Sequence, residues 1–126
     1  MKLQPDRADG VNAITRHDSA GIRVGQIDFL HSVLVPWQGD VAAWPPRNTD
    51  ELNAGHFEQI LAWQPELVIF GSGRRLRFVA PALMRSLIER RIGVETMDTA
   101  AACRTYNVLA GEGRTVVAAL IIEPDT

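Results

Sequence analysis

Apolar stretches alternate with helix-length segments through the second half of the chain, and this alternation limits the possible folds more than any other feature. Residues 66–70, Glu66-Leu67-Val68-Ile69-Phe70, form a near-continuous apolar run of the kind that is buried on both faces of a sheet. Residues 94–97 and 116–122 are the two other predicted strands. Helices between successive strands require right-handed crossovers, which favour parallel pairing. The pattern predicts a three-layer α/β fold, with a mixed sheet built around a βαβαβ core.

Capping signals place the helices of this pattern. Asn53 is the predicted N-cap of the first helix, and Pro81 suits the first turn of the second, with Gly93 near its C-terminal cap. Asp98 or Thr99 is predicted to cap a third helix, which runs to about residue 109 or 110. The side chains predicted to point inward from the second helix are Leu83, Met84, Leu87 and Ile88.

The first half of the chain has the pattern of short strands joined by turns. Ser19-Ala20-Gly21 predicts a turn, and the β-branched run 32–35 is closed by Pro36. The gaps between these strands are too short for crossover helices, so we expect antiparallel pairing. We therefore expect one domain over residues 12–122, with an N-terminal antiparallel β addition and flexible ends at 1–11 and 123–126.

Composition argues against several classes of protein. Hydrophobic residues make up 46% and charged residues 22% of the 126 residues, as in an ordinary globular domain. The net charge of −2 provides no global basic field for nucleic acid or an anionic membrane. A single cysteine, Cys103, fits a reducing compartment, the N-terminus lacks an apolar signal core, and the longest apolar run is too short to span a bilayer. We expect a cytoplasmic protein without membrane insertion.

A candidate pocket lies where two predicted strands end. Gly71-Ser72-Gly73 leaves one strand, with Arg74 beside it, and Thr99 opens a helix after the next strand. In open α/β sheets, ligands bind outside the carboxyl ends of parallel strands, and a helix N-terminus favours anions. Cys103 and Arg104, from the start of that helix, complete the candidate set. In the alternative interpretation, the glycines only permit a tight strand exit and Thr99 only caps the helix.

The sequence contains no catalytic signature. Cys103 lies near a helix N-terminus, which can lower a thiol pKa, but alanines surround it and no histidine is tied to it by spacing, so a core position is the alternative. Ser72 lacks the glycine at position 70 that a nucleophile elbow needs. His17, His31 and His56 show no metal-ligand spacing. We expect no cofactor and no metal. The absence of a catalytic signature favours a protein that is not an enzyme.

Two surface features are candidates for protein contacts. Residues 74–91 contain six arginines and one glutamate, which suits an acidic protein partner or, in the alternative, is a solvated helix face. Phe78 is the only aromatic residue within 74–91, so binding of single-stranded nucleic acid is poorly supported. Trp37 and Trp44 lie near Pro45-Pro46, and tryptophans beside prolines often anchor interfaces. In the alternative, the two tryptophans cover the open face of the sheet. Trp37, Trp44 and Arg85 are therefore the candidate interface residues.

Several segments together resemble domain-of-unknown-function family 498. The matching segments are 97–109 (Met-Asp-Thr-Ala-Ala-Ala-Cys-Arg-Thr-Tyr-Asn-Val-Leu), 112–114, 116–120, 67–73 and 32–36. The family usually has Gly-Thr-Gly at the strand exit, and Ser72 here keeps the hydroxyl. The resemblance implies a compact α/β domain and, in the mitochondrial branch, a helper in assembling respiratory complex I. The signature residues Arg104, Thr105, Asn107, Glu112 and Arg114 would hold the helix and last strand together, with Glu112 pairing with an arginine.

Two functions are compatible with these features. The first is a non-enzymatic binding or assembly module that acts through contacts with a protein partner, whose identity the sequence does not give. The alternative is a small-ligand (anion) binding protein, or an undescribed enzyme, that uses the crevice at Gly71–Gly73 and Thr99.

Overall fold

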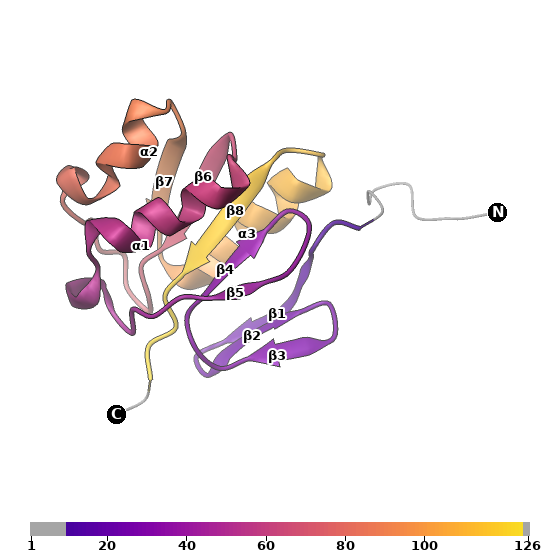
Figure 1. Ribbon diagram of the computed structural model, residues 1–126. Helices are drawn as coiled ribbons and strands as arrows, with labels where there is room; N and C mark the ends of the chain where they lie inside the picture. Colours follow the sequence, from indigo (N-terminus) through magenta and orange to yellow (C-terminus); the bar gives the residue numbers. More distant parts are fainter. Residues whose placement is uncertain (1–9, 125–126) are drawn as a thin grey trace.

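The computed structural model describes residues 10–124 and has the predicted mixed α/β architecture (Figure 1). A five-stranded sheet has the order β5-β4-β8-β6-β7, and a separate three-stranded sheet has the order β1-β2-β3. Most of the predicted flexible ends, residues 1–9 and 125–126, lies outside the described residues. The strands are β1 (Ile14–Asp18), β2 (Gly21–Val24), β3 (Ile27–Phe29), β4 (Val33–Pro36), β5 (Ala42–Ala43), β6 (Leu67–Gly71), β7 (Gly93–Met97) and β8 (Val116–Leu120).

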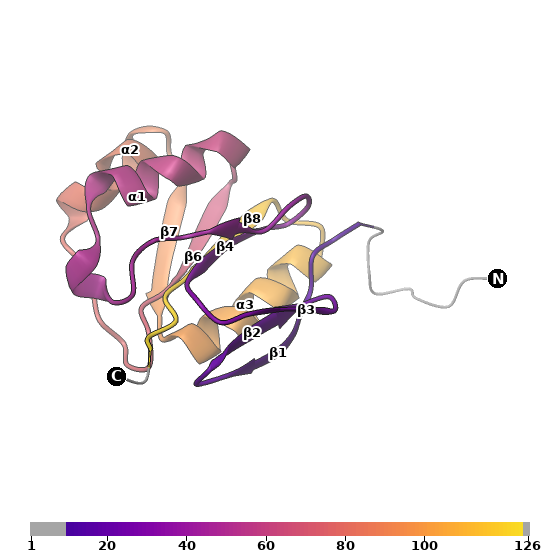
Figure 2. The ribbon, with the colours of Figure 1, turned by 60° about the horizontal axis from the view of Figure 1, so that its bottom comes forward.

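The parallel part of the main sheet follows from the alternation of strands and helices. β6 pairs in parallel with β7 on one side and β8 on the other, and all five of its residues are buried. Helix α3 (Thr99–Gly111) covers one face, and α1 (Ala54–Glu58) and α2 (Arg85–Glu89) lie on the other (Figures 1 and 2). Because alternate strand residues point to opposite faces, the sheet has a separate hydrophobic core on each side.

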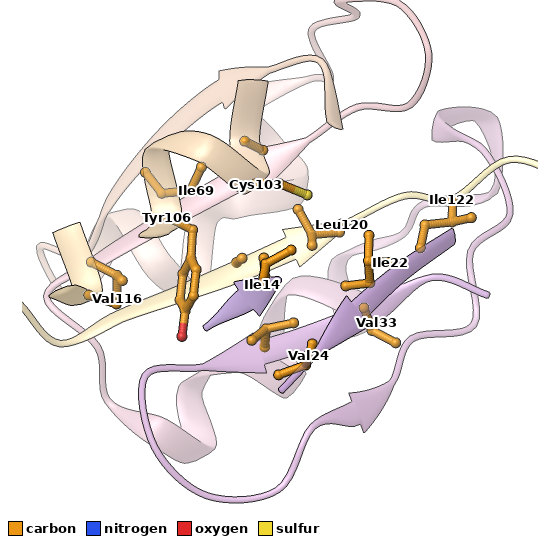
Figure 3. Close-up of a cluster of buried hydrophobic side chains, with 14 of the residues drawn as sticks. Ile14, Ile22, Val24, Val33, Ile69, Cys103, Tyr106, Val116, Leu120 and Ile122 are labelled. Atoms are coloured by element: carbon orange, nitrogen blue, oxygen red, sulfur yellow. The ribbon is translucent and has the colours of Figure 1, made fainter. Parts of the chain in front are cut away.

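The N-terminal strands are antiparallel, but they divide between the two sheets. β4 pairs with β8 and β5 in the main sheet, whereas β1, β2 and β3 form their own sheet. This small sheet packs beneath α3, and Figure 3 shows side chains of β1 and β2 meeting those of α3 and β8. The layers are thus the α1 and α2 side, the main sheet, and α3 with the small sheet.

The capping residues define the helix starts. Asn53 caps α1 in a reciprocal arrangement with His56: the His56 amide donates to Asn53 Oδ1, and His56 Nδ1 accepts from the Asn53 amide, both at 3.1 Å. Asp98 caps α3, where its carboxylate accepts from the Ala101 amide at 2.8 Å. A short 3₁₀ turn, η1 (Thr49–Glu51), comes before α1. After α1 the chain continues into a 3₁₀ helix, η2 (Gln59–Trp63).

The second predicted helix differs in detail from the expectation. It begins as a 3₁₀ helix, η3 (Pro81–Met84), and becomes α-helical only at Arg85. Ile88 was expected to point inward but is 54% exposed, because the short helix buries only Leu87 completely. The chain reverses at Arg91, whose φ is 61°, and Gly93 is already the first residue of β7. Within residues 10–124, every helix is too short or too polar to traverse a lipid bilayer.

Candidate functional site

The exit of β6 and the start of α3 meet at the carboxyl edge of the parallel strands. The Gly73 amide donates to Thr99 Oγ1 at 2.9 Å, and the Thr99 amide donates to the Gly73 carbonyl at 2.9 Å. Thr99 Oγ1 also donates to the Ile121 carbonyl, beyond the end of β8, at 2.7 Å. One threonine hydroxyl therefore connects three chain segments at this edge.

A recess of about 240 Å³ opens beside this junction. Its lining includes Gly73, Arg74 and Thr99 from the candidate pocket, together with residues that the sequence did not suggest. The additional residues come from the end of β1 and the turn after it (His17, Asp18 and Ser19), the α3 start (Asp98 and Ala100) and the C-terminal segment (Ile121, Ile122 and Glu123). The small sheet thus forms one wall of the recess.

The polar groups of the recess are largely bonded within the chain. The Arg74 amide donates to Glu123 Oε1 at 2.6 Å, and Arg74 Nη2 donates to the Glu123 carbonyl at 3.0 Å. The amides of Gly73 and Ala101 are held by Thr99 and Asp98. An anion would need these donors and would meet the carboxylates of Asp98 and Glu123, so this charge distribution disfavours an anionic ligand.

Ser72 lies beneath the surface and does not line the recess. It is only 2% exposed, and its hydroxyl donates to the Arg75 carbonyl at 2.7 Å and accepts from the Arg77 amide at 2.9 Å. A buried hydroxyl with both functions satisfied is not poised for nucleophilic attack. Its contacts instead fix the path of the loop that follows β6.

Cys103 and Arg104 are also separated from the recess. Cys103 is completely buried among the α3, β6 and small-sheet side chains (Figure 3). Arg104, next to it on α3, is exposed. Burial raises the pKa of the Cys103 thiol from 9.0 to about 12. The thiol therefore stays protonated at neutral pH and has the character of a small core side chain.

Cys103 is expected to resist alkylation in the folded protein. With a pKa about three units above its ordinary value, the thiolate fraction at pH 8 is about a thousandfold lower than in the unfolded chain. Iodoacetamide labelling followed by mass spectrometry at pH 8 should be slow in buffer and rapid in concentrated urea. Because the pKa is raised in the folded state, this thiol supports stability below pH 9 and loses that contribution as the pH rises toward 12. Equal labelling rates with and without urea would show that the thiol is accessible and ionised.

The candidate interface residues have three different environments. Trp44 is 2% exposed, donates from Nε1 to the His56 carbonyl at 3.1 Å, and meets the ring of Phe57 edge-on with centroids 5.8 Å apart. It is a core residue and is not available at the surface. Trp37 is half-buried and packs against both cores, whereas Arg85 is exposed on α2.

A groove that the sequence pattern did not suggest lies between the edges of the two sheets. It has a volume of about 470 Å³ and lies between the edge strand β3 and the segment 39–41 that leads into β5. Its apolar lining consists of Val24, Ile27, Phe29 and Val41, and Asn12 and Asp40 supply polar groups. Ile27 is 64% exposed. Apolar residues at 27, 29 and 30 were the only sequence feature that could have indicated this groove. Their position opposite residues 39–41 arises only when the chain folds.

One family-signature residue on α3, Asn107, binds the small sheet. Asn107 Nδ2 donates to the Ile14 carbonyl and its Oδ1 accepts from the Ile14 amide, both at 2.8 Å. The predicted pairing of an arginine with Glu112 is wrong for Arg114, which bonds Glu66 Oε2 at 3.1 Å. The reason is that the parallel strands β6 and β8 start at the same edge, which places Glu66 beside Thr115 and Arg114. The Thr115 amide, followed by the Arg114 guanidinium, lowers the pKa of Glu66.

The described residues contain no group of three or more histidine, cysteine, aspartate or glutamate side chains that could hold a metal ion.

Comparison with known proteins gives consistent matches. The family model described as "Protein of unknown function (DUF498/DUF598)" matches residues 14–121. NADH dehydrogenase (ubiquinone) 1 alpha subcomplex assembly factor 3 of Bos taurus is 37% identical over 63% of this chain and 48% of its own length. The Mus musculus protein of the same name is 32% identical over 88% of this chain and 60% of its own length. The chain therefore spans about half the length of these curated relatives.

The fold also matches solved structures. The crystal structure of a Bordetella parapertussis protein superimposes with a TM-score of 0.86 at 38% identity, covering 92% of this chain and 99% of that one. The fold described above is therefore shared with a solved structure over nearly the whole length of both chains.

Proposed function

Because this chain belongs to the DUF498/DUF598 family, we propose that it is a non-catalytic assembly-type module that acts by binding a protein partner. The observation that carries the proposal is the similarity to two mammalian proteins that are named as assembly factors of NADH dehydrogenase (ubiquinone). The state of the two candidate nucleophiles supports a non-catalytic role, because Ser72 and Cys103 are both buried and neither is activated.

The groove between β3 and residues 39–41 is the proposed docking site for the partner. Its apolar side chains include Ile27, which folding leaves mostly exposed, and β3 is an edge strand with unpaired backbone groups on its outer side. An extended partner segment can add to such an edge, and alternate side chains can enter the adjoining groove. Asn12 stabilises the far wall by donating from Nδ2 to the carbonyls of Pro36 and Gly39 at 2.8 Å.

Affinity capture from the native host tests the proposal. The variants Ile27→Glu and Val41→Glu place a charge in the apolar groove and should lose a partner that the unaltered protein retains. Val108→Glu is the matched control, because Val108 is 59% exposed on α3 and lies outside the groove lining. A respiratory-complex subunit among the lost partners would support the assembly role. Retention of every partner by all three folded variants would refute the groove as the docking site.

The second candidate is a small ligand in the recess at Gly73 and Thr99. The recess favours this candidate because it forms at the predicted carboxyl edge of the parallel strands. A metabolite that raises the melting temperature of the unaltered protein, and not of Ala100→Trp, would support it. Melting shifts of this kind without any groove-dependent protein partner would replace the assembly proposal by the ligand proposal.

A further inference from the structure

The loop between β6 and η3, residues 74–80, combines exposed apolar side chains with arginines. We refer to these residues as the basic loop. Phe78 is 76% exposed and Leu76 is 52% exposed, and they alternate with the exposed Arg75 and Arg77. Figure 2 shows the chain running from the carboxyl end of β6 along the outside of the domain toward α2. Two large apolar side chains therefore face water between positive charges.

Contacts on both sides of Leu76 and Phe78 fix the backbone of the loop and keep these two side chains exposed. The buried Ser72 hydroxyl holds the Arg75 carbonyl and the Arg77 amide, which fixes the first part of the loop. Val79 packs against the core on the α1 and α2 side and fixes the second part. Between these two anchors, the side chains of Leu76 and Phe78 remain outside.

Charge is strongly segregated in the same region. Residues 74–91 carry a formal charge of +5, although the whole chain carries −2, so the rest of the chain carries −7. Arg85, Arg90 and Arg91 are exposed on and beside α2. Within residues 10–124, Arg75 and Arg77 take part in no ion pair, whereas Arg16, Arg23, Arg47 and Arg114 do. This asymmetry orients the basic loop toward a negatively charged surface.

We propose that the basic loop docks the protein peripherally on an anionic lipid surface, with Phe78 and Leu76 entering the interface and the arginines binding headgroup phosphates. Basic residues beside a membrane and a few inserted apolar side chains are sufficient for reversible attachment. None of the recesses described above is lined by Leu76 or Phe78, and a fluid bilayer requires no complementary pocket.

Vesicle flotation of the full chain tests this proposal. The protein should float with vesicles of equal parts phosphatidylcholine and phosphatidylglycerol, and not with phosphatidylcholine alone. Each basic residue near an anionic surface accounts for about a fivefold change in binding, so Arg75→Gln with Arg77→Gln should weaken it about 30-fold. Phe78→Ser should weaken it about tenfold by removing the inserted ring. Added salt should release the protein.

Ile27→Ser is the matched control, since Ile27 is similarly exposed but lies in the groove at β3. It should leave vesicle binding unchanged, and Phe78→Ser should leave capture of the groove partner unchanged, so this proposal and the proposed function can fail independently. Circular dichroism establishes that each variant is folded. The proposal is overturned if the protein does not float with anionic vesicles or floats equally well with neutral ones. It is also overturned if Phe78→Ser binds anionic vesicles as tightly as the unaltered protein. Arginine-dependent retention on polyglutamate without vesicle binding would also overturn it and would assign the loop to an acidic protein.

Discussion

Gly71→Ala is expected to lower the free energy of unfolding by about 2–3 kcal/mol, because the added methyl group would overpack a junction with no space. A Cβ atom at position 71 would lie 2.9 Å from both the Cα and the Oγ1 of Thr99, and 3.1 Å from the Cβ of Ala102. Two of these contacts are with a backbone carbon and a Cβ, which side-chain rotation cannot move. β6 cannot retreat either, because it pairs with β7 and β8 on its two sides.

Urea denaturation at constant pH would measure this loss, with Gly93→Ala as the matched glycine in the neighbouring strand. A Cβ atom at position 93 would meet only Leu67 Cδ1, at 3.1 Å, and that flexible side chain can move. Gly93→Ala should therefore cost less than about 1 kcal/mol. If both variants lose the same stability, the close approach of β6 to α3 is not what requires a glycine at position 71.

The order of elements in the second half could be predicted because local signals agree there. The apolar run 67–70 indicated a strand buried on both faces, and Asn53 and Asp98 indicated the helix starts that the structure has. The carboxyl-edge rule also predicted that the segments at Gly73 and Thr99 would meet, which two mutual hydrogen bonds confirm. Each of these predictions rests on residues close in sequence or on a rule of sheet topology.

The division of the N-terminal strands into two sheets could not be predicted, because it depends on contacts between residues far apart in the chain. The Tyr106 hydroxyl shares its proton between the carbonyls of Asn12 and Pro36, at 2.8 and 3.1 Å, which links α3 to the segment leading into β1 and to β4. The prolines near Trp44 left open whether its indole is a surface anchor or covers the sheet, and it packs edge-on against Phe57 and Phe70 from later elements. Alternation of apolar residues identifies strands but not the face or sheet that they join.

The sequence indicated where the recess lies, at the carboxyl edge of the parallel strands, but not most of the residues that line it. Glu123 falls in a segment that was expected to be a flexible end, and its carboxylate accepts from the Arg74 amide. Ser72 was proposed as a ligand contact, whereas its hydroxyl bonds the backbone of Arg75 and Arg77, in a loop without periodic pattern, and lies 3.2 Å from the Met97 carbonyl. The path of that loop, and hence the role of the hydroxyl, follows from tertiary structure alone.

Asn107→Asp is expected to destabilise the protein by about 3 kcal/mol at neutral pH and to loosen the small sheet from α3. Asn107 both donates to and accepts from the backbone of Ile14, at 2.8 Å in each case. A carboxylate of the same shape still accepts from the Ile14 amide, but it can only repel the Ile14 carbonyl, which then lacks a donor. Thermal and urea unfolding of the two proteins would measure the loss.

The effect should depend on pH in a definite direction. Protonation restores a donor toward the Ile14 carbonyl, so the pKa of the introduced carboxyl is raised in the folded state. The variant should therefore regain stability relative to the unaltered protein as the pH falls through that raised pKa toward about 4. Asn53→Asp is the matched control: that side chain only accepts, from the His56 amide, and aspartate is an equally good N-cap, so little loss is expected. A loss at position 107 that stays constant with pH would mean that the Ile14 carbonyl does not need the amide donor, and that packing alone holds the small sheet on α3.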